Sequence, residues 1–139
     1  MMAGAEKGAT LSLSPATATY ASGATVVVTV RCNSGGTAVN AVQANLSYPT
    51  ARLTFQSIDT SMSPFTTTIE STGGSGSVRI GVGILSGSVT GNQIVGTVTF
   101  TAGSAGATAV DFANGSGIAD AANSTDICKV KNEANYVIT

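Results

Sequence analysis

The segment Ala24–Cys32, ATVVVTVRC, carries the pattern that decides the fold. Every second residue is apolar, so one face of an extended chain here consists of Val26, Val28, Val30 and Cys32. The opposite face includes a threonine and an arginine. Alternation with a period of two residues is typical of a β-strand with one buried face. We therefore expect a strand in this segment, with its valine face packed against a second layer.

The same alternation recurs along most of the chain, and no long segment has the 3.6-residue apolar period of a helix. Turn-forming residues, such as those of Asn33–Gly36, separate the alternating segments. We expect further strands at Leu11–Ser14, Ala41–Tyr48, Arg52–Ile58, Phe65–Glu70, Ser77–Leu85, Gln93–Ala102, Thr108–Ala113 and Ala134–Thr139. Strands with one apolar face need a second sheet to cover that face.

The predicted fold class is therefore all-β, a nine-stranded antiparallel β-sandwich with jelly-roll or Greek-key connections. We expect one domain over residues 9–139, preceded by a tag or linker remnant at residues 1–8. Within the strands, the alternation predicts that Phe65 and Ile69 point inward. It also predicts that Ile94 points inward and Val95 outward.

Composition excludes several classes of function. The 139 residues contain no histidine, which excludes histidine-based catalysis and histidine metal sites. The net charge of −1 does not suit a nucleic-acid binder. No apolar run is long enough to span a membrane. The low charge and the abundance of Thr, Ser, Gly and Ala resemble secreted bacterial surface proteins, so we expect a secreted or cell-surface location, although no signal peptide is visible.

Two smaller features leave alternatives open. Cys32 and Cys128 either form a disulfide or remain free thiols that pack as small apolar residues. The D-x-x-N-x-x-D pattern of Asp120, Asn123 and Asp126 supplies oxygen ligands for Ca²⁺, but the more ordinary interpretation is a cluster of Asx turns that closes a loop. We expect no cofactor.

The strand Ser77–Leu85 gives the strongest indication of a binding surface. Gly81 and Gly83 fall on its outward face, where a glycine usually marks a bulge or a close backbone approach. The neighbouring outward residues make this face flat, polar and nearly uncharged: Gln43, Asn45, Thr68 and Arg79, with Leu85 at the rim. Such a face suits docking of a protein partner, and a solvated face without a partner is the alternative.

The order and spacing of several segments resemble those of cohesin domains, over about residues 9–139. The resemblance rests on these segments: AVQANLSYPTARLTF (41–55), SGSVRIGVGI (75–84), VTGNQIVGTVTFTA (89–102) and GIADAANSTDIC (117–128). Tyr48 and Leu53 keep the tyrosine-to-leucine spacing of the family, whereas Pro49-Thr50 replaces its usual Asp-Pro.

The resemblance implies a nine-stranded sandwich and a non-catalytic function, the binding of a dockerin, which is a small helical module that needs Ca²⁺. It also implies that one sheet face binds this partner. Carried over by position, that face offers Gln43, Asn45, Thr66, Thr68, Glu70, Arg79, Gly81, Gly83, Leu85, Ala109 and Asp111.

Three binding functions follow as hypotheses. The first is a protein-binding module outside the cell, with a dockerin-like or another surface protein as its partner. The second is a structural unit of a surface fibre or adhesin, in which terminal strands pair between copies. The third is a carbohydrate-binding module, which needs a planar aromatic strip although the chain has only three tyrosines and no tryptophan. We do not expect an enzyme, because no two acids pair on one strand face and serines lack a base.

Overall fold

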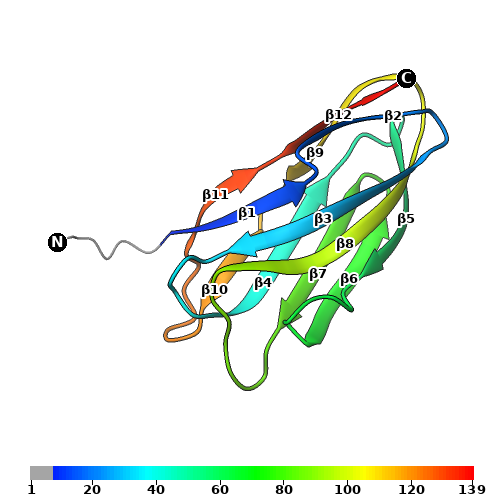
Figure 1. The fold of residues 1–139 in the computed structure, drawn as a ribbon. Coiled ribbons are helices and arrows are strands. Elements are labelled where there is room, and N and C mark those ends of the chain that lie inside the picture. The colour runs from blue at the N-terminus through cyan, green and yellow to red at the C-terminus, as the bar shows by residue number, and fades with distance from the viewer. Residues whose placement is uncertain (1–7) are drawn as a thin grey trace.

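Two β-sheets packed face to face make up residues 8–139, the part of the chain that the computed structural model describes (Figure 1). These residues form no helix, so they contain no apolar helix long enough to cross a membrane. The predicted linker remnant lies outside the described residues except for Gly8.

The first sheet has five strands, and its central strand contains the valine-rich alternation of residues 26–32. From one edge to the other, the strands are β11 (Cys128–Asn132), β1 (Ala9–Ser14), β3 (Thr25–Asn33), β8 (Asn92–Ala102) and β5 (Leu53–Asp59).

The second sheet has seven strands, six of which lie in one continuous order. These are β2 (Thr17–Tyr20), β12 (Ala134–Ile138), β9 (Gly106–Phe112), β4 (Val39–Ser47), β7 (Ser77–Gly83) and β6 (Thr67–Gly74). The seventh, β10 (Gly117–Asp120), pairs with the first half of β4, whereas β9 pairs with the end of β4.

The predicted all-β sandwich is confirmed, with twelve strands in the described residues rather than nine. The three additional strands are β2, β10 and β11, which have four, four and five residues. The sheets are also mixed rather than purely antiparallel, because β11 runs parallel to β1 and β2 runs parallel to β12. Backbone pairing creates these short strands, and they carry too few alternating apolar residues to be seen in the sequence.

The core lies between the two sheets, as the alternation predicts. Val26, Val28 and Val30 are fully buried on the inner face of β3. Aromatic rings join the layers, since Phe100 of β8 packs edge-to-face on Tyr48, with ring centroids 4.9 Å apart. Burial of apolar side chains from both sheets is the main stabilising contribution in such a fold.

Two β-bulges reverse the predicted direction of side chains. In β8, Val30 pairs with Gly96 and Arg31 pairs with Ile94, so Val95 is an extra residue. Val95 is fully buried and Ile94 only half-buried, which is the opposite of the prediction. A bulge inserts one residue and thereby shifts every following side chain to the other face.

The second bulge lies in β6, between Thr68 and Glu70, and it makes Ile69 the extra residue. The prediction that Ile69 points inward is wrong, because its side chain is 71% exposed. Phe65, on the approach to the strand, is buried as predicted.

Candidate functional site

The outer face of β10, β4, β7 and β6 brings together five of the predicted site residues. The register places Gln43 beside Gly81, and Gly81 beside Glu70. The same register places Asn45 beside Arg79. Because β4 is distant in sequence from the consecutive strands β6 and β7, only the lateral pairing of β4 with β7 assembles the group. We call the set Gln43, Asn45, Glu70, Arg79 and Gly81 the polar row.

Hydrogen bonds connect the polar row across three strands. The Gln43 amide donates to Asn45 Oδ1 at 2.7 Å and to Glu70 Oε1 at 3.1 Å. Glu70 Oε2 lies 3.3 Å from Arg79 Nε, which forms an ion pair. The side-chain amide of Asn45 in turn donates to the backbone carbonyl oxygen of Asn114 at 2.9 Å. The row is thus held in one arrangement, and its two charges neutralise each other.

This arrangement of the polar row requires a glycine at position 81, because the side chain of Gln43 crosses directly over Gly81. A Cβ atom at this position would lie 2.6 Å from Gln43 Oε1 and 3.4 Å from Glu70 Cβ. The absence of a side chain therefore opens the path by which Gln43 reaches Glu70. Gly83, two residues along, leaves ordinary contact distance to Ile69 and Ala41.

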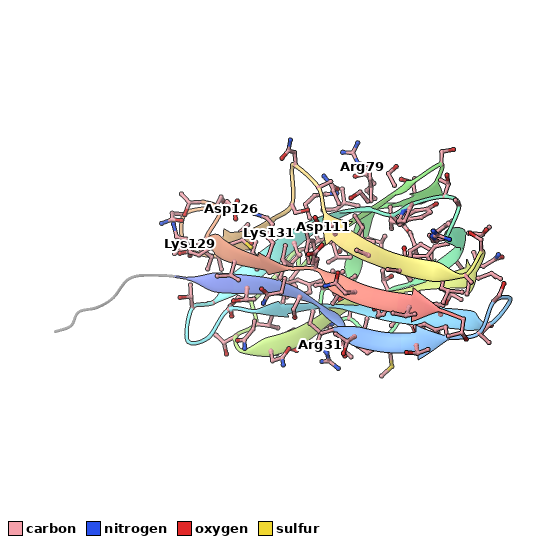
Figure 2. The ribbon with its side chains drawn as sticks, turned by 90° about the horizontal axis from the view of Figure 1, so that it is seen from above. Arg31, Arg79, Asp111, Asp126, Lys129 and Lys131 are labelled. Carbon is pink, nitrogen blue, oxygen red and sulfur yellow. The ribbon has the colours of Figure 1, made fainter. Side chains whose placement is uncertain are left out.

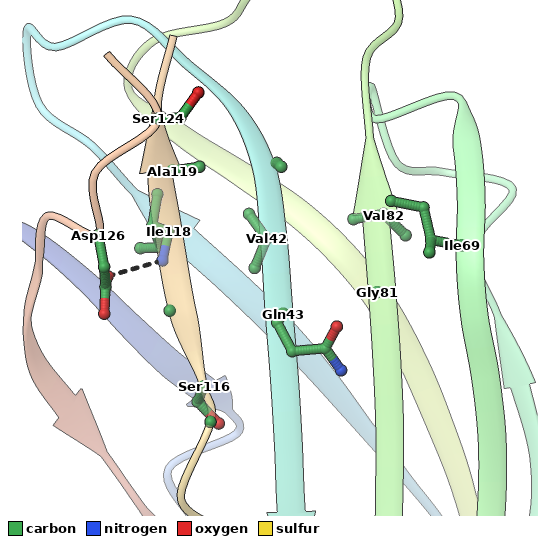
Figure 3. Close-up of a pocket in the computed structure, with 13 residues that line it drawn as sticks. Val42, Gln43, Ile69, Gly81, Val82, Ser116, Ile118, Ala119, Ser124 and Asp126 are labelled. Carbon is green, nitrogen blue, oxygen red and sulfur yellow. Dashed lines mark hydrogen bonds between the residues drawn. The ribbon is translucent and has the colours of Figure 1, made fainter.

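A hollow of about 400 Å³ adjoins the polar row on the same face (Figure 3). Its floor is formed by small residues and backbone, with Ala41, Gly81 and Ala119 among them. Ile69 stands at one end of the hollow and Asp126 at the other. Among the described residues that line the hollow, Asp126 is the one with a charged side chain.

Gly83 adjoins the polar row on the same face of β7, whereas the other remaining predicted site residues lie outside the row. Thr68 pairs with Val82, whose side chain is in the core. The Thr68 hydroxyl lies 3.1 Å from the hydroxyl of Thr60. Leu85 lies beyond the end of β7 and is 89% exposed. The other three are Thr66, which is exposed just before β6, and Ala109 and Asp111, which are on β9.

Sequence reasoning missed Ile69 and Ser116 as parts of this face. Ile69 was assigned to the core because the bulge that turns it outward leaves no mark in the alternation. Ser116 is buried. Its hydroxyl accepts from the backbone nitrogen of Asn45 at 2.9 Å and lies 3.0 Å from the backbone carbonyl oxygen of Asn45. It thereby fixes the loop between β9 and β10 to β4.

The loop after β10 is closed by Asx hydrogen bonds of its own acidic and amide side chains. Asp120 Oδ1 accepts from the Ala122 amide nitrogen at 2.8 Å, and Asn123 Oδ1 accepts from that of Thr125 at 3.1 Å. Asp126 Oδ1 accepts from the amide nitrogens of Ile118 and Cys128, at 3.0 and 2.9 Å. In the described residues no group of three or more Asp, Glu, Cys or His side chains is arranged to hold a metal ion.

Both cysteines are free thiols, so the disulfide considered from the sequence is not formed. Strand β1 lies between β3, which carries Cys32, and β11, which carries Cys128. Two strand spacings amount to about 9.5 Å, beyond the usual Cα separation of a disulfide. Burial, together with the nearby Cys128, raises the pKa of Cys32 to about 12.

The aromatic side chains do not form the strip that a carbohydrate-binding surface needs. Tyr48 and Tyr136 are buried, and Tyr20 packs edge-to-face on Tyr136 with centroids 5.5 Å apart. Phe65 and Phe100 are also buried.

The terminal strands β1 and β12 each have partners on both sides within the chain, so neither is a free edge for pairing between copies. The outer faces of the two sheets point in opposite directions, as Figure 2 shows by the positions of Arg79 and Arg31.

Comparison with known proteins identifies one family. The family model described as "Cohesin domain" matches residues 10–135. No curated protein matches the sequence.

Solved structures with this fold come from bacteria and an archaeon. CaCohA2 from Clostridium acetobutylicum has a TM-score of 0.82 at 19% identity, covering 96% of this chain and 92% of that chain. A non-cellulosomal cohesin from Archaeoglobus fulgidus has a TM-score of 0.74 at 17% identity, covering 94% and 91%. The Coh-OlpC–Doc435 complex of Clostridium thermocellum, a type I cohesin–dockerin complex, contains a match with a TM-score of 0.76 at 10% identity, covering 99% and 96%. At these identities the likeness concerns the fold.

Proposed function

Because the chain belongs to the cohesin domain family, we propose that it is a non-catalytic protein-binding module that docks a dockerin-type partner outside the cell. The existence of a cohesin–dockerin complex among proteins of the same fold supports this class of partner. The polar row and the adjoining hollow supply the surface for it.

The observation that carries the proposal is the fixed arrangement of the polar row. Gln43 is held by two acceptors, and Glu70 is held by both Gln43 and Arg79. A surface whose side chains are already ordered loses little conformational entropy on binding, which favours association. The face also combines hydrogen-bonding groups with exposed apolar surface, as docking surfaces commonly do.

A non-catalytic role agrees with the distribution of the acids in the described residues. Glu70 is engaged with Arg79, and Asp126 caps backbone amides of its own loop. Asp59 lies on the other sheet, where its side chain accepts from the Ser61 amide nitrogen at 2.8 Å. No two of these acids converge on a cleft in a way that would suit general acid–base chemistry.

Capture by a panel of immobilised, Ca²⁺-loaded dockerins tests the proposal, with Doc435 as one member. We expect the wild-type domain to be retained by at least one dockerin and released when EDTA removes Ca²⁺ from the partner. The double variant Arg79→Glu, Gly81→Arg should lose retention. It places two carboxylates side by side and covers the polar row with a long side chain.

The control for the exchange at position 79 is Arg31→Glu, which makes the same Arg→Glu replacement on the outer face of the other sheet (Figure 2). Retention should not change in this variant. Equal retention of the double variant and the wild type would mean that a different surface binds. Absence of capture by every dockerin would reject this class of partner.

A further inference from the structure

The ends of the hollow carry different chemistry, and both ends lie on one line across the strands. Val82 of β7 pairs with Thr68, next to Ile69, on one side and with Val42 on the other. Val42 in turn pairs with Ile118, whose amide nitrogen donates to Asp126. Ile69 and Asp126 are therefore at the same level on the sheet, as Figure 3 shows.

The apolar end is an exposed isoleucine that the bulge in β6 turns outward. Ile69 is 71% exposed, although the alternation in the sequence predicts that it points into the core. Bulges often redirect a side chain next to a functional site. The Ile69 side chain lies over Gly83, with Cδ1 3.6 Å from the position that a Cβ atom would take there. It thus forms an apolar wall above a position of β7 that has no side chain.

The opposite end is the exposed carboxylate of Asp126. Between the two ends, the charges of the polar row are already paired, since Glu70 bonds Arg79. A charged partner group over the middle of the face would therefore find no unpaired counter-charge. A positive group beside Asp126 would find the negative charge of its carboxylate.

We infer that this hollow selects a partner helix that crosses the strands, with an aliphatic side chain against Ile69 and a basic side chain two turns away facing Asp126. The inference rests on the proposed function and adds the chemistry of the partner to it.

The spacing follows from the sheet and from helix geometry. Ile69 lies on β6, and the Asp126 carboxylate accepts from Ile118 of β10. From β6 to β10 there are three strand spacings, about 14 Å in total. Two helical turns advance about 11 Å, and the length of a lysine or arginine side chain covers the remainder. Residues i and i+7 of a helix also share one face. The expected partner motif is therefore an aliphatic residue and a basic residue seven positions apart.

The experiment selects binders from a displayed library of a Ca²⁺-loaded dockerin whose exposed helix positions are randomised. Selections are run in parallel against the wild-type domain, Ile69→Thr and Asp126→Asn. Asparagine keeps the Oδ1 acceptor for Ile118 and Cys128 but removes the charge. Threonine keeps the β-branched shape that suits a strand.

Two further variants are the matched controls, Val27→Thr and Asp59→Asn. Both residues lie on the five-stranded sheet. Val27 is an apolar residue that is 47% exposed, as a control for Ile69. Asp59 accepts a hydrogen bond from the Ser61 backbone nitrogen, as Asp126 does from Ile118 and Cys128.

Binders to the wild type should carry the aliphatic and basic pair. They should bind Ile69→Thr and Asp126→Asn about tenfold more weakly each. The affinity for Asp126→Asn should also depend less on salt. Binders selected against Asp126→Asn should lose the preference for a basic residue, and both controls should bind as the wild type does.

Binders that show no such pair, or that bind both variants with wild-type affinity, would overturn the inference while leaving the proposed function in place. A library that yields no binder at all would instead contradict the proposed function. A concentration-dependent dimer of the domain that Ile69→Thr abolishes would assign the hollow to a second copy of the chain and overturn the inference.

Discussion

Replacing Gly81 by alanine should separate the binding function of the domain from its stability. The added Cβ atom would lie 2.6 Å from Gln43 Oε1, so one of the two must move. Gly81 has no left-handed backbone conformation, and alanine can therefore adopt the same backbone. The obstructing atom is the end of a flexible, half-buried side chain. We expect Gln43 to rotate away and to release its hydrogen bonds to Asn45 and Glu70.

The expected cost in stability is small because two effects oppose each other. Each of the two released hydrogen bonds contributes about 0.5–1.5 kcal/mol net. Replacing a glycine within a strand by alanine restores about 0.5–1 kcal/mol. The free energy of unfolding should therefore fall by about 0–2.5 kcal/mol, which leaves a typical domain folded. Capture of a dockerin should nevertheless weaken, since the polar row is no longer fixed.

Urea unfolding gives the stability, and the side-chain amide signals of Gln43 in ¹⁵N NMR spectra report its release. Gly83→Ala is the control on the same strand and face, because its Cβ atom would meet neighbouring atoms at 3.4 Å or more. A loss above about 3 kcal/mol for Gly81→Ala would refute the reasoning, since it would place Gln43 in a rigid environment. Unchanged Gln43 amide signals would refute it as well.

Two further predictions concern the contact of Gly73 with Phe55 and the thiol of Cys32. Gly73→Ala should destabilise the domain by about 1–3 kcal/mol in thermal melts, because its Cβ atom would overlap the Phe55 ring; an unchanged melting temperature would contradict this. The thiol of Cys32, with its pKa raised to about 12, should stay protonated and resist a thiol reagent at pH 8. The contribution of the protonated thiol to the free energy of unfolding should be complete below about pH 9 and decline as the pH rises toward 12. Rapid labelling of Cys32 in the native protein would contradict the raised pKa.

The sequence alone sets which residues of a strand share a face. Alternation placed Val26, Val28 and Val30 in the core because burial of apolar side chains outweighs other preferences in an extended segment. The same rule put Gln43 and Arg79 on an outer face, where the structure has them. Glycine within the strand at Gly81 indicated a close approach, and the crossing side chain of Gln43 is that approach.

Only the tertiary structure decides which strands become neighbours and where a strand gains an extra residue. The bulge that exposes Ile69 arises from the register between β6 and β7, and that register depends on two segments at once. The short strands β2, β10 and β11 form because a partner backbone is present, and their own residues give little sign of them. The hollow between Ile69 and Asp126 follows from both effects, because it lies across strands that are distant in the sequence.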